Sequence, residues 1–367
     1  MNYNELNILT QMIEESKKQS KLYIAGNYWK FYEKNILKQI KKNDLKKFRA
    51  WEGGAGVGNI QSFGGGEPEL GRNSKRYFHP YDIKYSTIDN NFFVRAYNFI
   101  INKLSSIFSF FSFFALRASE GRKYFFALIR EKQKILYQHV LHLDKDLLEI
   151  SDSTFGDPIG FYKNDKFYTS LFLENLIKIN FIKRNTDFNS IENIVELGAG
   201  IGSLASCFLK LKKNLKYLIV DIPPALFISE YYLKNLGFKV FGYEELKKNN
   251  YSNLNEVFKD FQVCCLPTWR LDFIKVSKFD LFINIASLQE MEKEQSLNYI
   301  KFFRERIKKN MYVENLIEGH HKTDKEGSFG VLNPTTKKDF EKEILDLFSI
   351  KLSEIEENNY KSIYEKN

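Results

Sequence analysis

The stretch that decides the fold is Val195-Glu196-Leu197-Gly198-Ala199-Gly200-Ile201-Gly202-Ser203. A short run rich in β-branched residues, 191–197, leads into it and predicts a strand, and residues 203–211 are expected to form a helix. Glycines allow a tight turn and a close approach of the backbone to a ligand, and the first turn of a helix offers unpaired N–H groups. The stretch therefore predicts a strand–turn–helix unit with a ligand bound at the turn.

The spacing of the glycines separates two kinds of cofactor. A dinucleotide-binding turn has the pattern G-x-G-x-x-G, whose third glycine lets the helix pack closely beside the pyrophosphate. Here the pattern is G-x-G-x-G, and Ser203 stands where that third glycine would fall. Glu196, two residues before the first glycine, supplies a carboxylate that suits a ligand with an ammonium group. These two features argue against NAD.

A second carboxylate, Asp221, follows the next expected strand, 217–220, and lies 25 positions after Glu196. A carboxylate at such a strand end can accept hydrogen bonds from both hydroxyls of an adenosine ribose. Together with the glycine turn, it predicts S-adenosylmethionine as the cofactor. A P-loop is not predicted, because no Gly-Lys-Ser/Thr follows the glycine-dense stretch at 53–66.

The chain reads as two parts, a mainly helical region at 1–165 and a region of alternating strands and helices at 166–367. The second part is expected to contain strands at 191–197, 217–220, 238–241, 261–265, 279–284 and 311–317, and helices at 203–211, 224–236 and 295–307. Such alternation predicts an α/β fold with a mostly parallel sheet and helices on both faces.

Residues 191–317 resemble a class I S-adenosylmethionine-dependent methyltransferase. The runs VELGAGIG, YLIVDIPPALFISEYYL and FDLFINIASLQEM are similar, more narrowly, to putative sugar O-methyltransferases. The double proline after the ribose acid, Pro223-Pro224, and the tripeptide Gln289-Glu290-Met291 carry most of that narrower similarity. The resemblance implies a Rossmann-like, doubly wound sheet with an N-terminal helical region. It does not extend past about residue 333, where the chain is short and rich in Lys and Glu, and so it does not predict the last hairpin of the fold.

The resemblance also implies roles for individual residues. Those expected to bind the cofactor are Glu196, Gly198, Gly200 and Gly202 at the methionine moiety, Asp221 at the ribose, Ile222 and Leu266 near the adenine, and Asn284 facing the sulfonium. Trp269 covers the purine or belongs to the core; both alternatives stay open. Ser287, Gln289 and Glu290 lie where acceptors are expected to enter, at the carboxyl ends of the strands.

The implied activity is methylation of a sugar hydroxyl, in a free sugar, a nucleotide sugar or a surface glycan. The hydroxyl must lose a proton as the new bond forms, so a general base is expected, with Glu290 first and His320 or His321 second. A divalent metal held by Glu314 or Glu318 is an alternative that nothing in the sequence fixes. Two other functions stay open: methylation of another small hydroxylated metabolite, and a non-catalytic binding protein with a methyltransferase fold.

Two nucleic-acid chemistries are disfavoured by the sequence. Enzymes that methylate amino groups of bases usually carry Asn/Asp-Pro-Pro-aromatic after the fourth strand, and this chain has Asn284-Ile285-Ala286-Ser287. A cytosine C5 enzyme needs a reactive thiolate, whereas Cys264-Cys265 lies in an apolar, strand-like run where inert core cysteine is expected. No nucleic-acid partner is predicted.

The composition is that of a globular protein of 367 residues with 43% hydrophobic and 28% charged residues. Its 55 basic and 46 acidic side chains give a net charge of +9, but the two signs are interleaved, which favours an ordinary solvated surface. No apolar stretch reaches the roughly 18 to 20 residues that a bilayer span requires. With three cysteines and no signal-like start, a reduced cytoplasmic protein without a disulfide framework is expected.

Three features of the first 165 residues carry weaker expectations. The glycine-dense region at 50–80, with Trp51 and Arg72 among its side chains, is interpreted as a surface loop or as a lid over the acceptor. The Phe-rich stretch at 99–129 is expected to be a packed amphipathic helix or to contact a membrane peripherally. His139 and His142 are expected on a helix surface rather than in a metal site.

Overall fold

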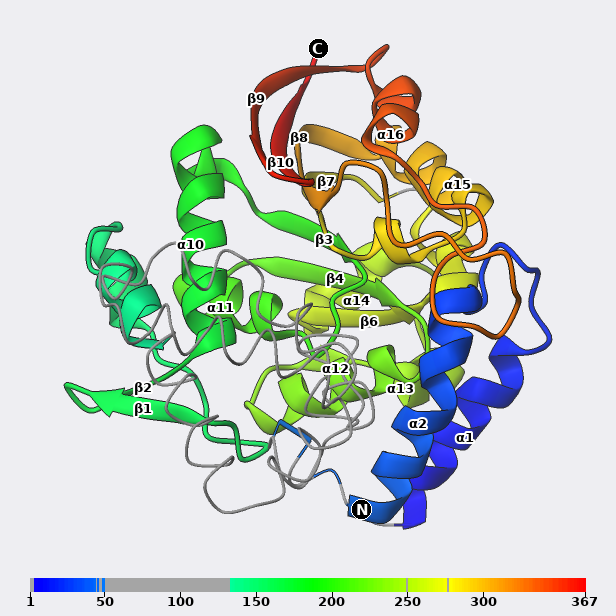
Figure 1. Cartoon of the computed structure of the whole chain (residues 1–367). Helices are drawn as coiled ribbons and strands as arrows, with labels where there is room; N and C mark the ends of the chain where they lie inside the picture. Colours follow the sequence, from blue (N-terminus) through cyan, green and yellow to red (C-terminus); the bar gives the residue numbers. More distant parts are fainter. Residues whose placement is uncertain (1–2, 44, 46–47, 50–132, 249, 276) are drawn as a thin grey trace, which may run out of the picture.

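The computed structural model describes residues 3–43, 45, 48–49, 133–248, 250–275 and 277–367. Its centre is an eight-stranded sheet in the order β5-β6-β4-β3-β7-β8-β10-β9 (Figure 1). The strands are β3 (Asn193–Leu197), β4 (Lys216–Asp221), β5 (Val240–Phe241), β6 (Val263–Pro267), β7 (Phe279–Ile285), β8 (Ile307–Leu316), β9 (Phe348–Glu356) and β10 (Asn359–Lys366). All are parallel except β10, which runs antiparallel to both β8 and β9.

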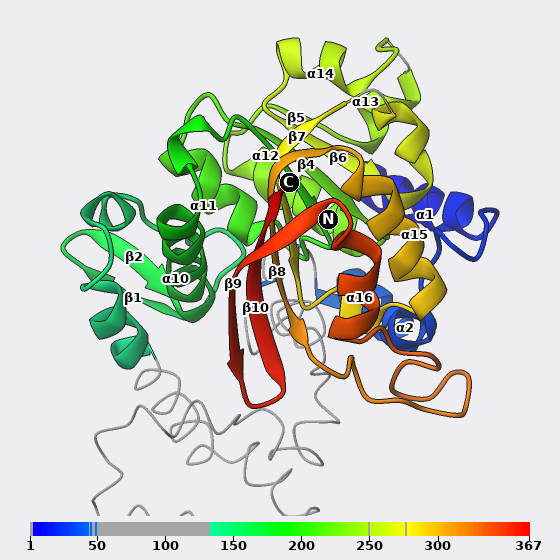
Figure 2. The ribbon, with the colours of Figure 1, turned by 90° about the horizontal axis from the view of Figure 1, so that it is seen from above.

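Helices cover both faces of this sheet (Figure 2). Successive strand residues alternate between two buried clusters: Ile194 and Ile219 belong to one, and Val195 and Leu218 to the other. The first cluster includes α10 (Ser170–Asn185), α11 (Ser203–Leu211) and α12 (Ala225–Asn235). The second includes α14 (Leu254–Asp260), α15 (Lys293–Arg304) and α16 (Lys337–Ile344). The order of layers is helix, sheet, helix, as predicted.

The strand order fixes where a ligand can bind. From β3 the chain moves outward through β4 and β6 in one direction, and then returns to build β7 and β8 on the other side of β3. In open parallel sheets the connections diverge at such a switch point, which leaves a crevice at the carboxyl ends of the two strands. The end of β3, where the glycine turn begins, is therefore the expected site.

Most of the elements predicted between 191 and 317 are present in the structure. The helix α11 has the predicted bounds, and the strand at 279–284 is confirmed as β7 with one further residue. The helix expected at 295–307 instead begins at Lys293 and ends at Arg304, and Ile307 opens β8. Its apolar side chain continues the helical spacing but is buried as the first residue of a strand. The last hairpin, which the resemblance did not predict, is present as β9 and β10.

The N-terminal part described here packs against the same core. Helices α1 (Tyr3–Ser16) and α2 (Asn27–Asn43) contribute Leu9, Met12 and Tyr28 to the cluster that contains α10 to α12. A small antiparallel pair, β1 (Gly160–Lys163) with β2 (Lys166–Thr169), leads into α10. The predicted division at residue 165 falls at the turn of this pair and stays a prediction.

Two predictions fall outside the described residues: the lid at 50–80 and the Phe-rich stretch at 99–129. Within the described residues, His139 and His142 are exposed at the end of the helical turns at 133–140, as expected. None of the helices in the described part of the chain is long and apolar enough to cross a bilayer. All three cysteines are buried, and burial raises the pKa of the Cys264 and Cys265 thiols.

A buried ion pair ties the end of the first described segment to the sheet domain. Arg49 Nη2 lies 2.7 Å from Asp152 Oδ2, and the two side chains are 0% and 1% exposed. Asp152 also accepts a hydrogen bond from Thr169 Oγ1 at 2.5 Å, and Arg49 Nη1 donates to the carbonyl oxygen of Ser153 at 2.8 Å. Tyr232 of α12 donates to Asp152 Oδ1 at 3.4 Å. The pair therefore joins residues before 50, around 152 and in α12.

Breaking this pair should destabilise the fold strongly. The substitution Arg49→Met removes the guanidinium and leaves the Asp152 carboxylate buried without its cation, which costs about 3–5 kcal/mol of unfolding free energy. Urea denaturation followed by circular dichroism measures the change. The control is Arg184→Met, which removes the partially exposed pair with Asp144 and should cost less than about 1 kcal/mol. Equal effects of the two substitutions would contradict the assignment of Arg49 as a structural tie.

Candidate functional site

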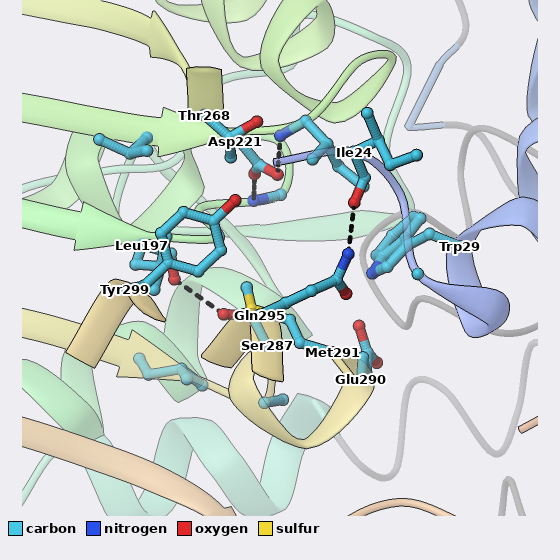
Figure 3. Close-up of a pocket in the computed structure, with 17 residues that line it drawn as sticks. Ile24, Trp29, Leu197, Asp221, Thr268, Ser287, Glu290, Met291, Gln295 and Tyr299 are labelled. Carbon is cyan, nitrogen blue, oxygen red and sulfur yellow. Dashed lines mark hydrogen bonds between the residues drawn. The ribbon is translucent and has the colours of Figure 1, made fainter. Parts of the chain in front are cut away.

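A pocket of about 570 Å³, counting the part open to solvent, lies at the carboxyl ends of β3, β4 and β7 (Figure 3). The lining is mostly apolar with a few polar groups: Ile24, Gly26, Trp29, Leu197, Gly198, Gly200, Val220, Asp221, Ile222, Thr268, Ile285, Ala286, Ser287, Glu290, Met291, Gln295 and Tyr299. The pocket thus occupies the crevice that the strand order predicts.

The glycine turn between β3 and α11 requires glycine for two reasons. Gly198, Gly200 and Gly202 have φ angles of 78°, 59° and 76°, in the left-handed region that other residues rarely adopt. A Cβ atom added at Gly198 would also lie 2.3 Å from the side chain of Ser287, at the end of β7. The turn is therefore both specially folded and tightly packed against the neighbouring strand.

Asp221, at the end of β4, holds the glycine turn in place. Its Oδ2 accepts the backbone N–H of Gly200 at 3.2 Å, and its Oδ1 accepts the N–H of Ile222 at 2.8 Å (Figure 3). The side chain is buried, and burial raises the pKa of this carboxyl to about 7, although the backbone hydrogen bonds act in the opposite direction. Asp221 lines the pocket, and its carboxylate is held by backbone N–H groups and not by a basic side chain of the lining.

The end of β7 is fixed by a network of buried polar side chains. Asn284 Nδ2 donates to the carbonyl oxygen of Leu197 at 2.9 Å, and Ser287 Oγ donates to the same oxygen at 2.8 Å. Asn315 donates to Asn284 Oδ1 at 2.9 Å. Ala286, between Asn284 and Ser287 in the sequence, has a φ of 57°, a strained left-handed conformation for a residue with a side chain. Asn284 supports the pocket wall from behind and does not line it.

Glu290 is the second acid of the pocket. It ends the short helical turn η7 (Leu288–Glu290), and only 6% of it is exposed. Burial raises the pKa of its carboxyl well above the usual range; hydrogen bonds from the Tyr28 and Trp29 side chains oppose this shift, and the Asp221 carboxylate adds to it. A bound cation would lower the pKa of this carboxyl.

Glu196 is buried in β3 but is not among the lining residues. Tyr217 Oη donates to its Oε2 at 2.8 Å, from the neighbouring strand β4. Burial raises the pKa of the Glu196 carboxyl to about 8, and the tyrosine hydrogen bond offsets part of that effect. The predicted contact of Glu196 with a ligand ammonium group stays a prediction.

Some of the predicted site residues line the pocket and others do not. Gly198, Gly200, Asp221, Ile222 and Glu290 line the pocket together. Gly202 is the residue before α11, and Leu266 is buried in the core. His320 packs its ring against Tyr28, with the ring centroids 4.6 Å apart, and does not line the pocket.

The alternatives left open for Trp269 and for a metal can also be placed. Trp269 lies beside a second cavity with Glu15 and Lys247, while its neighbour Thr268 lines the first. Glu314 accepts a hydrogen bond from Tyr312 Oη at 2.6 Å. Among the described residues, no group of three or more His, Cys, Asp or Glu could hold a metal ion.

Sequence reasoning missed the residues that the N-terminal segment contributes. Ile24 and Trp29 line the pocket from the loop before α2 and from the first turn of that helix (Figure 3). Neither residue belongs to a recognisable motif. An aromatic residue at a helix start is ordinary core material, and no local pattern marks a contact with strands nearly 200 residues away.

The similarity of this chain to known proteins is remote. No protein-family model matches the chain. No curated protein matches it either. Among solved structures, the mitomycin 7-O-methyltransferase is similar at 12% identity and a TM-score of 0.35, over 54% of this chain and 57% of that one.

Two shorter solved structures match over more of their own length. Magnesium protoporphyrin IX methyltransferase from Synechocystis PCC 6803 matches at 12% identity and a TM-score of 0.35, over 53% of this chain and 80% of that one. An S-adenosylmethionine-dependent methyltransferase from Clostridium acetobutylicum matches at 13% identity and a TM-score of 0.35, over 53% of this chain and 90% of that one. This chain spans little more than half the length of the mitomycin enzyme. The strand order itself identifies the class I methyltransferase fold.

The buried acids make a prediction about pH. Glu196 keeps its proton in the folded chain up to about pH 8 but loses it near pH 4.5 when unfolded. The folded state therefore binds more protons than the unfolded state within that window, and stability falls as the pH rises through it. Between pH 5.5 and 7.5 this group alone should cost about 2 kcal/mol.

The substitution Glu196→Gln should remove that part of the pH dependence, so that its unfolding free energy changes less between the two pH values than that of the wild type. Urea denaturation at pH 5.5 and 7.5 measures both. The matched control is Glu294→Gln, on the exposed face of α15, which should retain the wild-type slope. An unchanged slope in Glu196→Gln would contradict the burial of a protonated carboxyl in β3.

Proposed function

We propose that this protein is an S-adenosylmethionine-dependent O-methyltransferase whose acceptor is a sugar hydroxyl. The observation that carries the proposal is the glycine turn held by the Asp221 carboxylate at the switch point of the sheet. The same place in the fold combines this turn with a buried acid and an apolar wall. An adenosyl ligand with a charged methionine end requires these three features together.

The residues present fit the cofactor. Gly200 lines the pocket and has no side chain to keep a ligand away from the backbone. Asp221 can accept hydrogen bonds from two vicinal hydroxyls, as a ribose offers, and Ile222 and Val220 supply apolar surface beside it. The carboxyl groups of Asp221 and Glu290 face a pocket whose lining contains no basic side chain among the described residues. A cationic ligand would relieve this imbalance.

When bound, the cofactor supplies an electrophilic methyl group on a sulfonium. The chain's own tasks are then to bind, to align the acceptor oxygen and to take up its proton. Glu290 is the base that we propose, because its carboxyl lines the pocket and a bound cation would lower its raised pKa, so that it can ionise and take up a proton. The apolar lining keeps water away from the reacting atoms.

The sugar acceptor is supported by the sequence resemblance and by the kind of surface that the pocket offers. A sugar ring has one apolar C–H face and one polar edge, and the pocket lining offers the apolar Met291 side chain beside the Glu290 carboxyl. Two alternatives are outcomes of the experiments below: another small hydroxylated metabolite as acceptor, and binding without turnover.

The first experiment tests the cofactor site. The substitution Asp221→Asn keeps the side-chain shape and one acceptor oxygen but removes the charge that strengthens hydrogen bonds from a ribose, so affinity should fall at least about 10-fold. Isothermal titration calorimetry with S-adenosylmethionine measures it. The control is Asp272→Asn, whose carboxylate is exposed and does not line the pocket. No binding to the wild-type chain at millimolar concentration would overturn the proposed function.

The second experiment tests the base. The substitution Glu290→Gln keeps the hydrogen-bonding shape but cannot take up a proton, so methyl transfer should fall by about 100-fold while cofactor affinity changes by less than about 3-fold. Transfer of a radiolabelled methyl group to a panel of nucleotide sugars, methyl glycosides and phenols measures the rate. The exposed Glu294→Gln serves as the matched control. Full activity in Glu290→Gln would assign the proton to another acceptor, such as water.

A further inference from the structure

Residues 21–29, here called the strap, cross the pocket; they comprise the end of the loop after α1 and the first turn of α2. Gln295 of α15 holds the strap from below: its Nε2 donates to the carbonyl oxygens of Lys21 at 2.7 Å and Ile24 at 2.9 Å. Thr268, at the end of β6, donates through Oγ1 to the carbonyl oxygen of Tyr23 at 2.6 Å. Figure 3 shows the Gln295 amide directed at Ile24, with Trp29 beside it. Two side chains thus hold three carbonyl oxygens of the strap.

The far end of the strap is anchored independently. Asn27, which is 3% exposed, donates its backbone N–H to Glu292 Oε1 at 3.3 Å and its side-chain Nδ2 to the carbonyl oxygens of Ser328 and Gly330, each at 2.9 Å. Gly327 returns a hydrogen bond to Asn27 Oδ1 at 2.7 Å. The strap therefore spans the pocket between two fixed points and is not a loose terminal segment.

The strap touches the pocket with apolar side chains. Ile24 and Trp29 line the same cavity as Gly200 and Asp221, and Trp29 is only 9% exposed. The two side chains that hold the strap, Gln295 and Thr268, also line that cavity. A ligand held by the glycine turn and Asp221 would be enclosed on its other side by the strap.

We propose that the strap is part of the ligand site, that Ile24 and Trp29 pack against the bound adenosyl ligand, and that Gln295 and Thr268 are positioning residues that keep the strap closed over it. The identity of the ligand rests on the proposed function. A ligand covered in this way leaves only when the strap opens, so its dissociation rate depends on the hydrogen bonds that Gln295 and Thr268 make.

Two substitutions remove these hydrogen bonds without adding charge to the pocket. Gln295→Met deletes both N–H donors, and it also deletes the oxygen that accepts the N–H of Glu292 at 3.2 Å at the start of α15. Thr268→Val deletes the hydroxyl and keeps the branched shape. The matched control is Ser296→Ala, which removes a buried hydroxyl from the same helix that bonds Thr335 and does not touch the strap.

S-adenosylhomocysteine is the probe, and the fluorescence of Trp29 is the signal. The chain has three tryptophans, so a background of Trp51→Phe and Trp269→Phe leaves Trp29 as the single reporter. In stopped-flow displacement, each of the substitutions at Gln295 and Thr268 should speed dissociation of S-adenosylhomocysteine about 5- to 10-fold, and the two together about 50-fold. Ser296→Ala should stay within about 2-fold of the parent.

Equilibrium binding tests the contact itself. In the otherwise unmodified chain, Trp29→Ala should weaken binding of S-adenosylhomocysteine at least 10-fold by calorimetry, and Trp29→Phe should restore it to within about 3-fold, because an aromatic face is kept. Thermal unfolding of each variant separates this effect from loss of the fold. Absence of binding to the wild-type chain would overturn the proposed function and this inference with it. If S-adenosylhomocysteine binds but its dissociation rate is unchanged by the substitutions at Gln295 and Thr268, this inference is overturned and the proposed function is not.

Discussion

The close approach of the glycine turn to the end of β7 is the constraint on which the rest of the site depends. Gly198 lies so near Ser287 that no side chain fits between them, and Ser287 and Asn284 both donate to the carbonyl oxygen of Leu197. The ends of two strands are thereby locked together at the switch point of the sheet. Asp221 fixes the other side of the same turn through Gly200. The floor of the pocket is consequently rigid, and its adaptable parts lie above it.

The electrostatics of the pocket follow from that rigid floor. Two carboxyl groups, those of Asp221 and Glu290, are held in a largely apolar enclosure, and burial raises the pKa of both. Each disfavours ionisation of the other. A ligand that carries positive charge shifts both acids toward their ionised forms and is bound more tightly for that reason. Under the proposed function, loss of the sulfonium charge on methyl transfer would remove part of this attraction, so the same acids would favour both binding of the cofactor and release of its product.

The sequence was informative where function is carried by contiguous residues. The strand, the glycine turn, α11 and Asp221 lie within one unit of about 27 residues, and each had a physical signature of its own. Glu196 could be located in its strand, but not the face that its side chain takes, where it meets Tyr217 rather than the pocket. The last hairpin escaped prediction because β9 lies at the sheet edge and has mostly exposed residues, which weakens its apolar alternation.

The wall formed by residues 21–29 could not be predicted, because its partners are distant in the chain, and this distance has a consequence for biosynthesis. Asn27 pairs with Glu292 and Gly330, and Lys21 with Gln295, at separations of 265, 303 and 274 residues. Residues 21–29 leave the ribosome well before these partners have been synthesised. The enclosure therefore cannot be completed on a nascent chain until translation has passed Gly330.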